Sequence, residues 1–241
     1  AIKVRRIPGL DGRDKIQMRI DLGVLQMETH GRPDGTRPFG FDTLLAYHKS
    51  RLEGHIRIHG SASGFLLTPQ ECAALRLESL QFYYRYLSYF YLGDYAGVQR
   101  DTQTNLEIFD LVKARAQEKE DRYLLEHYRP YVIMMNTRAR CYQSLNSNQP
   151  EAAMDIVVEG INRIRQFFES GGQAYLSEEC EEIQLLSQMA QEILQSVPRS
   201  PLASLRHEMQ LAVAQEDYEK AAALRDEIRR LEADPAGAGI S

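Results

Sequence analysis

Residues 68–95 read TPQECAALRLESLQFYYRYLSYFYLGDY and contain both the start and the end of a long helix. Thr68 and Glu71 have the spacing of a capping box, and Pro69 occupies the first helical position. Gly93-Asp94 closes the helix, and a second long helix follows directly. Two long helices joined by so short a turn predict an antiparallel pair.

The helical pattern continues beyond this pair. Apolar residues recur every three or four positions over most of the chain up to residue 197. Pro130 lies inside one such segment and is expected to kink or briefly break it. The further predicted helices are 95–119, 121–145, 150–168 and 177–197. Together these segments predict an all-α protein whose body, residues 67–198, is an antiparallel helical array.

The first 66 residues have a different character, with many Gly and Pro residues. Residues 14–30 carry apolar side chains at helical spacing, with Gly31 as a potential cap. Four apolar residues in the same stretch also alternate as in a strand: Ile16, Met18, Ile20 and Leu22. We favour the helix there and expect a second helix over residues 41–53. The role of this N-terminal segment stays open at this point.

Three histidines in the N-terminal segment are candidate metal ligands. His48, His55 and His59 would share one face if a helix continued past Gly54, and they could then bind zinc. Gly54 and Gly60 weaken such a helix, and no carboxylate completes the set. No metal, other cofactor or catalytic residue is therefore predicted.

Cysteine usage and hydropathy bear on the compartment. The three cysteines form no CxxC pair and are expected to be reduced and buried; they are Cys72, Cys141 and Cys180. No apolar run approaches the roughly 20 residues that a membrane helix needs. No secretory signal is recognisable either. These observations predict a cytoplasmic protein without a membrane partner.

The charge of the chain is unevenly distributed. Lys and Arg number 29 and Asp and Glu number 34, which gives a net charge of −5. Residues 1–60 carry +4, residues 61–200 carry −6 and residues 201–241 carry −3. The overall acidity disfavours a protein that coats nucleic acid by bulk charge, but a basic end remains for a polyanion. Arg5 and Arg6 are the candidate nucleic-acid contacts.

Aromatic residues crowd the helix that follows Thr68. Of the 13 Tyr and 8 Phe residues, eight lie within residues 82–95. Tyrosine combines apolar area with a hydrogen-bonding tip, so Tyr83, Tyr86 and Tyr89 are candidates to line a binding groove. Burial of the helix among its neighbours explains the same residues and is the favoured interpretation. Stacking on nucleic-acid bases is a further alternative.

Residues 200–231 have the pattern of two short helices joined by a turn at residues 215–217. Apolar residues recur at steps of three and four on each side of that turn. They are Leu202, Leu205, Met209 and Ala212 before it, and Ala221, Leu224, Ile228 and Leu231 after it. Two helices this short bury little on their own and are marginal unless their apolar seam docks elsewhere. The pattern therefore predicts an interaction module.

This hairpin resembles the UVR motif through two segments, LRHEM at residues 205–209 and DYEKAAALRDEI at residues 217–228. The motif occurs in the excision-repair proteins UvrB and UvrC, in Clp-type unfoldases and in activators of bacterial protein-arginine kinases. The resemblance implies a hairpin that pairs with another such hairpin, often as an antiparallel bundle. The docking residues that it implies are Leu205, Met209, Tyr218, Ala222, Leu224, Arg225, Ile228 and Leu231. No GxxxxGK[ST] loop or nuclease-like metal cluster accompanies the motif, so excision chemistry is not implied.

The turns of the helical body resemble those of tetratricopeptide repeats. The resemblance rests on Leu92-Gly93-Asp94-Tyr95 and on the sequence after Pro150, with Ala152-Ala153. The two turns lie about 55 residues apart instead of roughly 34, and Gly97 stands where the repeat prefers Ala. The resemblance implies a TPR-like array of longer helices that presents a groove.

These features together predict a non-catalytic bacterial adaptor rather than an enzyme. It would bind a partner protein through the hairpin and the helical groove, and the partner would carry a UVR-type hairpin or be a second copy of the chain. The alternative is an accessory factor of nucleotide excision repair that contacts nucleic acid, the less favoured partner, through the basic N-terminal end. The expected domains are 1–66, 67–198, the hairpin 200–233 and a flexible tail 234–241.

Overall fold

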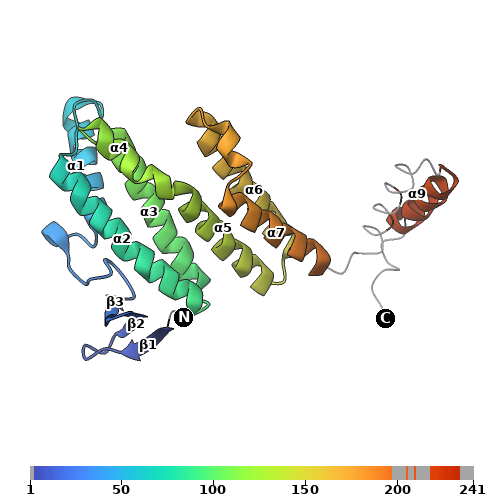
Figure 1. Ribbon diagram of the computed structural model, residues 1–241, viewed down its shortest axis with the longest axis horizontal. Coiled ribbons are helices and arrows are strands. Elements are labelled where there is room, and N and C mark those ends of the chain that lie inside the picture. Colours follow the sequence, from blue (N-terminus) through green and yellow to red (C-terminus); the bar gives the residue numbers. More distant parts are fainter. Residues whose placement is uncertain (1–2, 197–204, 206–208, 210–217, 234–241) are drawn as a thin grey trace. The chain divides into compact units, whose positions relative to one another are not determined.

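A computed structural model describes residues 3–196, 205, 209 and 218–233 of the chain (Figure 1). The chain divides into two compact units, residues 1–193 and residues 194–241. Among the helices described, none has the length and apolar character needed to cross a membrane.

Four long helices form the centre of the first unit, and each packs against the next one along the chain. They are α2 (Pro69–Tyr91), α3 (Tyr95–Arg115), α5 (Arg129–Asn146) and α6 (Pro150–Ser170). Consecutive members run antiparallel (Figure 1). The prediction of a mainly helical body is confirmed.

Shorter elements complete the described part of the chain. The α-helices are α1 (Leu44–His59), α4 (Lys119–Leu124), α7 (Glu181–Ser196) and, in the second unit, α9 (Tyr218–Ala233). Single turns of 3-10 helix are η1 (Pro38–Gly40), η2 (Glu126–Tyr128) and η3 (Ala174–Ser177). The helix expected at residue 177 thus begins four residues later, after η3.

Helix α2 begins and ends at the residues that predicted its two ends. Thr68 Oγ1 accepts a hydrogen bond from the Glu71 amide at 3.3 Å, and Glu71 Oε2 accepts one from the Thr68 amide at 2.9 Å. This reciprocal pair is the predicted capping box. Gly93 has a φ of 71°, a left-handed conformation that costs glycine little, and it ends α2 as expected. Asp94 Oδ1 then accepts from the Gly97 amide at 2.9 Å and caps α3.

The helical segment predicted over residues 121–145, with a kink or short break at Pro130, is interrupted slightly earlier than expected. Leu67 pairs with the chain beyond α3, because its amide donates to the Arg115 carbonyl at 2.8 Å and its carbonyl accepts from Gln117 at 2.9 Å. This pairing ends α3 before residue 119. The helical break then falls at residues 125–128, and Pro130 lies in the first turn of α5, where its missing N–H costs nothing.

The N-terminal segment corrects the all-α prediction, because it forms a small antiparallel sheet. Its strands are β1 (Lys3–Pro8), β2 (Asp14–Ile20) and β3 (Gly23–Glu28), in that order across the sheet. The helix favoured over residues 14–30 is therefore wrong. In that helix Ile20 and Val24 would face the core, yet they are 41% and 56% exposed. Strand alternation instead buries Ile16 and Met18 on one face, and the two-residue turn before Gly23 suits a hairpin.

Buried polar contacts attach the end of β3 to the helices. Arg85 on α2 donates two hydrogen bonds to the carboxylate of Asp101 on α3, at 2.6 and 2.9 Å. Its third nitrogen, Nη1, donates to the carbonyl oxygens of Glu28 and Gly31 at 3.0 and 2.9 Å. Since Arg85 and Asp101 are both buried, the pair satisfies its own charges and fixes the sheet at the same time.

Helix α1 is longer than the predicted span of residues 41–53. Thr43 Oγ1 accepts from the Ala46 amide at 2.9 Å and caps the helix, which continues through Gly54 and ends at Gly60. The buried carboxylate of Glu78 accepts the first free amides of α1, from Leu44 at 2.7 Å and Leu45 at 3.0 Å. A carboxylate at the positive end of a helix explains why Glu78 is tolerated in the core.

Candidate functional site

The apolar seam of the hairpin is formed in the second unit. Leu224 of α9 is 8% exposed, and Leu205 and Met209 of the preceding segment pack against it. Ile228, one turn after Leu224, is 7% exposed. Leu205 and Met209 both lie in helical backbone four residues apart, as Leu224 and Ile228 do, so two helical faces meet.

The other docking residues implied by the motif are placed differently. Ala222 is half-buried. Arg225 is exposed and pairs with the neighbouring carboxylate of Asp226 at 3.1 Å, so it lies on the outer side of α9. The side chains of Tyr218 and Leu231, and the flexible tail expected over residues 234–241, lie outside the described residues.

The three groove candidates on α2 do not share one environment. Tyr86 and Tyr89 are 1% and 2% exposed, so they belong to the core and not to an open groove wall. Burial raises the pKa of the Tyr86 hydroxyl, and the Tyr89 hydroxyl donates to the Thr29 carbonyl at 2.7 Å. Tyr83 alone is half-buried, with its ring 5.5 Å from that of Tyr86 and 6.3 Å from that of Tyr131 on α5. Burial therefore explains two of the three tyrosines.

Arg5 and Arg6, the candidate nucleic-acid contacts, point to opposite faces of the sheet. Arg6 forms an ion pair with Asp94 at the start of α3 and lies over the Tyr89 ring, so it faces the helices. Arg5 lies on the outer face, where Nε and Nη2 donate to Gln17 Oε1 at 3.0 and 2.8 Å. Neighbouring residues of a strand point to opposite faces, so Arg5 and Arg6 separate because residues 3–8 form β1, which the sequence analysis did not predict.

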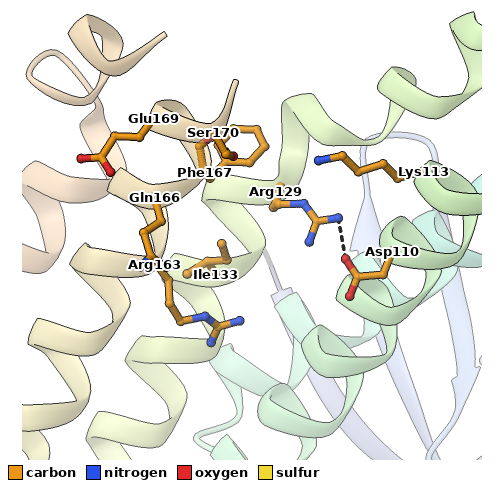
Figure 2. Close-up of a pocket in the computed structure, with 9 residues that line it drawn as sticks. All are labelled: Asp110, Lys113, Arg129, Ile133, Arg163, Gln166, Phe167, Glu169 and Ser170. Carbon is orange, nitrogen blue, oxygen red and sulfur yellow. Dashed lines mark hydrogen bonds and ion pairs between the residues drawn. The ribbon is translucent and has the colours of Figure 1, made fainter. Parts of the chain in front are cut away.

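An open cleft of about 590 Å³ lies between α3, α5 and α6 (Figure 2). Lys113 and Arg129 line one side of it and Arg163 lines the other, while the Glu169 carboxylate points away (Figure 2). In the described part of the chain Arg163 forms no ion pair. Sequence patterns did not point to this cleft, because its cations come from three helices that are far apart in the sequence.

Two of the cations in the cleft are already neutralised by acids. The buried carboxylate of Glu126 accepts from Arg129 at 2.6 and 2.9 Å and from Lys113 at 2.8 Å. Asp110 pairs with Arg129 on the cleft side at 2.9 Å. With these charges balanced, the arrangement stiffens the junction of α3 and α5 and leaves Arg163 as the cation available to a ligand.

The histidines of α1 and the cysteines are placed in the first unit. His48 is buried, whereas His55 Nε2 lies 2.8 Å from the Ser63 carbonyl oxygen and its ring lies 4.4 Å from that of His59. Among the described residues, no group of three or more His, Cys, Asp or Glu side chains could hold a metal ion.

The three cysteines are free thiols inside the fold, so their predicted burial is confirmed. Burial raises the pKa of the Cys72 and Cys141 thiols to about 11, which keeps both protonated at neutral pH. A protonated, buried thiol is a poor nucleophile, so these residues serve the packing of the core.

Comparison with known proteins bears on the hairpin alone. No curated protein and no solved structure matches the chain. Residues 199–234, which include Leu205, Met209 and all of α9, match the family model of the UvrB/uvrC motif. The resemblance to the UVR motif is thereby confirmed, and the chain carries a UvrB/uvrC motif within these residues.

Proposed function

We propose that this protein is a non-catalytic, cytoplasmic adaptor that binds a partner protein through its UvrB/uvrC hairpin. The observation that carries the proposal is the contact of Leu205 and Met209 with Leu224, because it places the motif's apolar residues on one seam. UVR hairpins pair with one another in the families that share the motif. The partner is accordingly a hairpin of the same kind, on another protein or on a second copy of this chain.

The small size of the seam supports this interpretation. In the part of the second unit that is described, the buried apolar side chains are Leu224 and Ile228, with Leu205 and Met209 partly covered. Full burial of an aliphatic side chain contributes about 1.5–3 kcal/mol, and short isolated helices are marginal in water. Pairing with a second hairpin would cover the remaining apolar area and stabilise both partners.

The helical body supplies a second, weaker element of the proposal. Its antiparallel helices and the half-buried Tyr83 support a TPR-like scaffold with one binding face. Tyr131, on the adjacent α5, has a pKa raised mainly by burial, as expected for a tyrosine packed between helices. In this scheme the body holds one protein while the hairpin docks on another.

Single charges placed on α9 test the proposal. Leu224→Asp puts a carboxylate into the seam, and Ala223→Asp puts the same charge on the exposed side one residue earlier. We expect Leu224→Asp, and likewise Leu205→Asp or Ile228→Asp, to abolish self-association in light scattering and capture of partners. Ala223→Asp should behave as the wild type, and circular dichroism should show the body folded throughout. Unchanged mass and unchanged capture for Leu224→Asp would refute the proposal.

The second candidate is an accessory role in nucleotide excision repair. It is supported by the motif itself, which UvrB and UvrC share, and by the basic N-terminal sheet. The test is direct binding of the purified chain to purified UvrB, with Leu224→Asp as the control that lacks the seam. Binding that survives this substitution would count against a role of the motif.

A further inference from the structure

The outer face of the three-stranded sheet carries three cations that no acid neutralises. Strand alternation and register place Lys3, Arg5 and Arg19 on the face opposite the buried Ile16 and Met18. All three cations are exposed. Among the described residues, Arg5 bonds only to the neutral Gln17, and neither Lys3 nor Arg19 forms an ion pair.

This arrangement has an electrostatic cost within the fold. Lys3 and Arg19 are directly opposite each other in the register of β1 and β2, and like charges in that position destabilise a sheet. The other end of the same face shows the usual solution, where Lys15 donates to Glu28 at 2.5 Å and to Asp11 at 2.7 Å. The unpaired cations at this end of the face therefore need another explanation, and binding of an anionic ligand provides one.

The face is also hollowed at this position. A concavity of about 240 Å³ is lined by Lys3, Val4, Arg5, Gln17, Arg19 and Val24. Gln17 donates to Gln26 at 3.0 Å, which extends the polar row across all three strands. The lining contains no aromatic ring and no carboxylate.

We infer that this outer sheet face binds the phosphate backbone of double-stranded nucleic acid. The face offers three unpaired cations and no aromatic ring among the residues that line its concavity, which favours a ligand of high charge density. Duplex DNA carries one negative charge per about 1.7 Å of its axis, whereas even a fully acidic extended peptide carries about one per 3.3 Å. Single strands are bound mainly by stacking on aromatic side chains, which this face lacks.

The same contacts predict how strongly salt weakens the complex. Three phosphate contacts give a slope of about −2.7 for the logarithm of affinity against the logarithm of salt concentration. Between 50 and 200 mM salt the affinity should therefore fall about 40-fold. Because the contacts are to phosphates only, the affinity should not depend on base sequence.

Two arginines on one strand provide a matched test. Arg5→Gln and Arg6→Gln remove the same charge from neighbouring positions of β1, but Arg6 faces the helices and pairs with Asp94. Binding of the full-length chain to a short labelled DNA duplex is measured by fluorescence anisotropy from 50 to 200 mM salt. We expect Arg5→Gln to reduce the slope by about 0.9, and Arg6→Gln to leave the slope unchanged. A variant with Lys3, Arg5 and Arg19 all changed to Gln should lose salt-dependent binding while keeping the wild-type circular dichroism.

Further ligands complete the test. A single strand of the same length and poly-glutamate should each bind more weakly than the duplex. The inference is overturned if the wild type fails to bind the duplex at 50 mM salt, or if the triple variant binds it equally well. It is also overturned if Arg6→Gln lowers the slope as much as Arg5→Gln does, or if poly-glutamate is the tighter ligand. Leu224→Asp should still bind the duplex, which separates this site from the hairpin.

Discussion

His48 shows how the core of α1 specifies a protonation state. Its ring is 2% exposed, and Arg51 Nη1 lies 3.1 Å from Nδ1. An arginine can only donate, so Nδ1 must accept and the proton of the neutral ring is on Nε2. Burial, together with the charge of Arg51, lowers the pKa of His48, although the Glu71 carboxylate opposes this shift. Arg51 is itself held by an ion pair with Glu71 and by the rings of Tyr47 and Phe65.

The lowered pKa of His48 predicts a loss of stability in mild acid. As the pH falls below the ordinary histidine pKa of 6.5, the unfolded chain binds a proton that the folded chain resists. The free energy of unfolding should therefore decrease as the pH falls from about 7 toward the lowered pKa of the folded protein. We expect His48→Gln to flatten this part of the profile measured by urea unfolding, whereas His59→Gln, at the exposed end of α1, should retain the wild-type slope. An equally steep profile for His48→Gln would contradict the assignment.

At the scale of residues, the sequence predicted the structural roles of some side chains correctly and gave no indication of others. The capping residues Thr68 and Glu71 act within four positions of each other, so local spacing was sufficient to identify them. Asp101 reads as an ordinary helix acid, and its partner Arg85 lies 16 positions away on another helix. The N-terminal carbonyls that complete the set are more than 50 positions from Arg85. Contacts at that distance depend on the tertiary fold and leave no local pattern.

At the scale of elements, the approach of α5 to α6 depends on one glycine. A Cβ at Gly160 of α6 would lie 2.3 Å from Thr137 Oγ1 and 2.5 Å from its Cγ2, on α5. Thr137 is fully buried, and in the described structure its hydroxyl has no hydrogen-bond partner. The helices can approach this closely because Gly160 leaves room for the branched side chain of Thr137.

This contact predicts a coupled pair of substitutions. Gly160→Ala should destabilise the fold by about 1–3 kcal/mol through overpacking, less about 1 kcal/mol gained in helix propensity. Thr137→Ala removes the two closest atoms, including an unpaired hydroxyl, and leaves Cβ at 2.9 Å, so it should restore much of the loss in the Gly160→Ala background. The measurement is a double-mutant cycle from denaturant unfolding, and we expect a coupling energy of about 0.5–3 kcal/mol. Additive effects would show that the helices do not meet at this point.

The strands show where element prediction failed, and the reason is physical. Residues 14–30 fit helical spacing and residues 16–22 also fit strand alternation, and the longer helical pattern was wrongly favoured. The strand is stabilised by tertiary contacts. β1 pairs with β2, and side chains of α2 donate hydrogen bonds to the carbonyl oxygens of Glu28 and Thr29. The four long helices α2, α3, α5 and α6 have one consistent period, and α2 and α3 also carry side-chain caps, so all four were predicted as helices. Their ends moved by a few residues where tertiary pairing intervened, as at Leu67 and Arg115.

At the scale of the whole molecule, the two units differ in how much each can stabilise itself. The first unit buries apolar side chains along its whole length, from Ile16 in β2 to Ile193 in α7. In the second, the described core is the small seam around Leu224. Within the first unit the charge is uneven, since residues 1–60 carry +4 although the whole chain carries −5. The first unit is stable on its own and carries the basic sheet, whereas the hairpin has little stability of its own. This difference fits a molecule that uses separate surfaces for separate ligands.

This difference predicts that the body folds independently of the hairpin. A chain ending at residue 196 retains α7 and loses residues 197–241. We expect its main thermal transition to shift by less than about 2 °C, because 1 kcal/mol corresponds to about 2–4 °C for a domain of this size. The truncated chain should keep its salt-dependent binding to a DNA duplex but lose partner capture and self-association. A fall of the midpoint by more than about 5 °C would instead show that the hairpin packs on its own body, since a module that docks only on a partner adds nothing to the stability of the isolated chain.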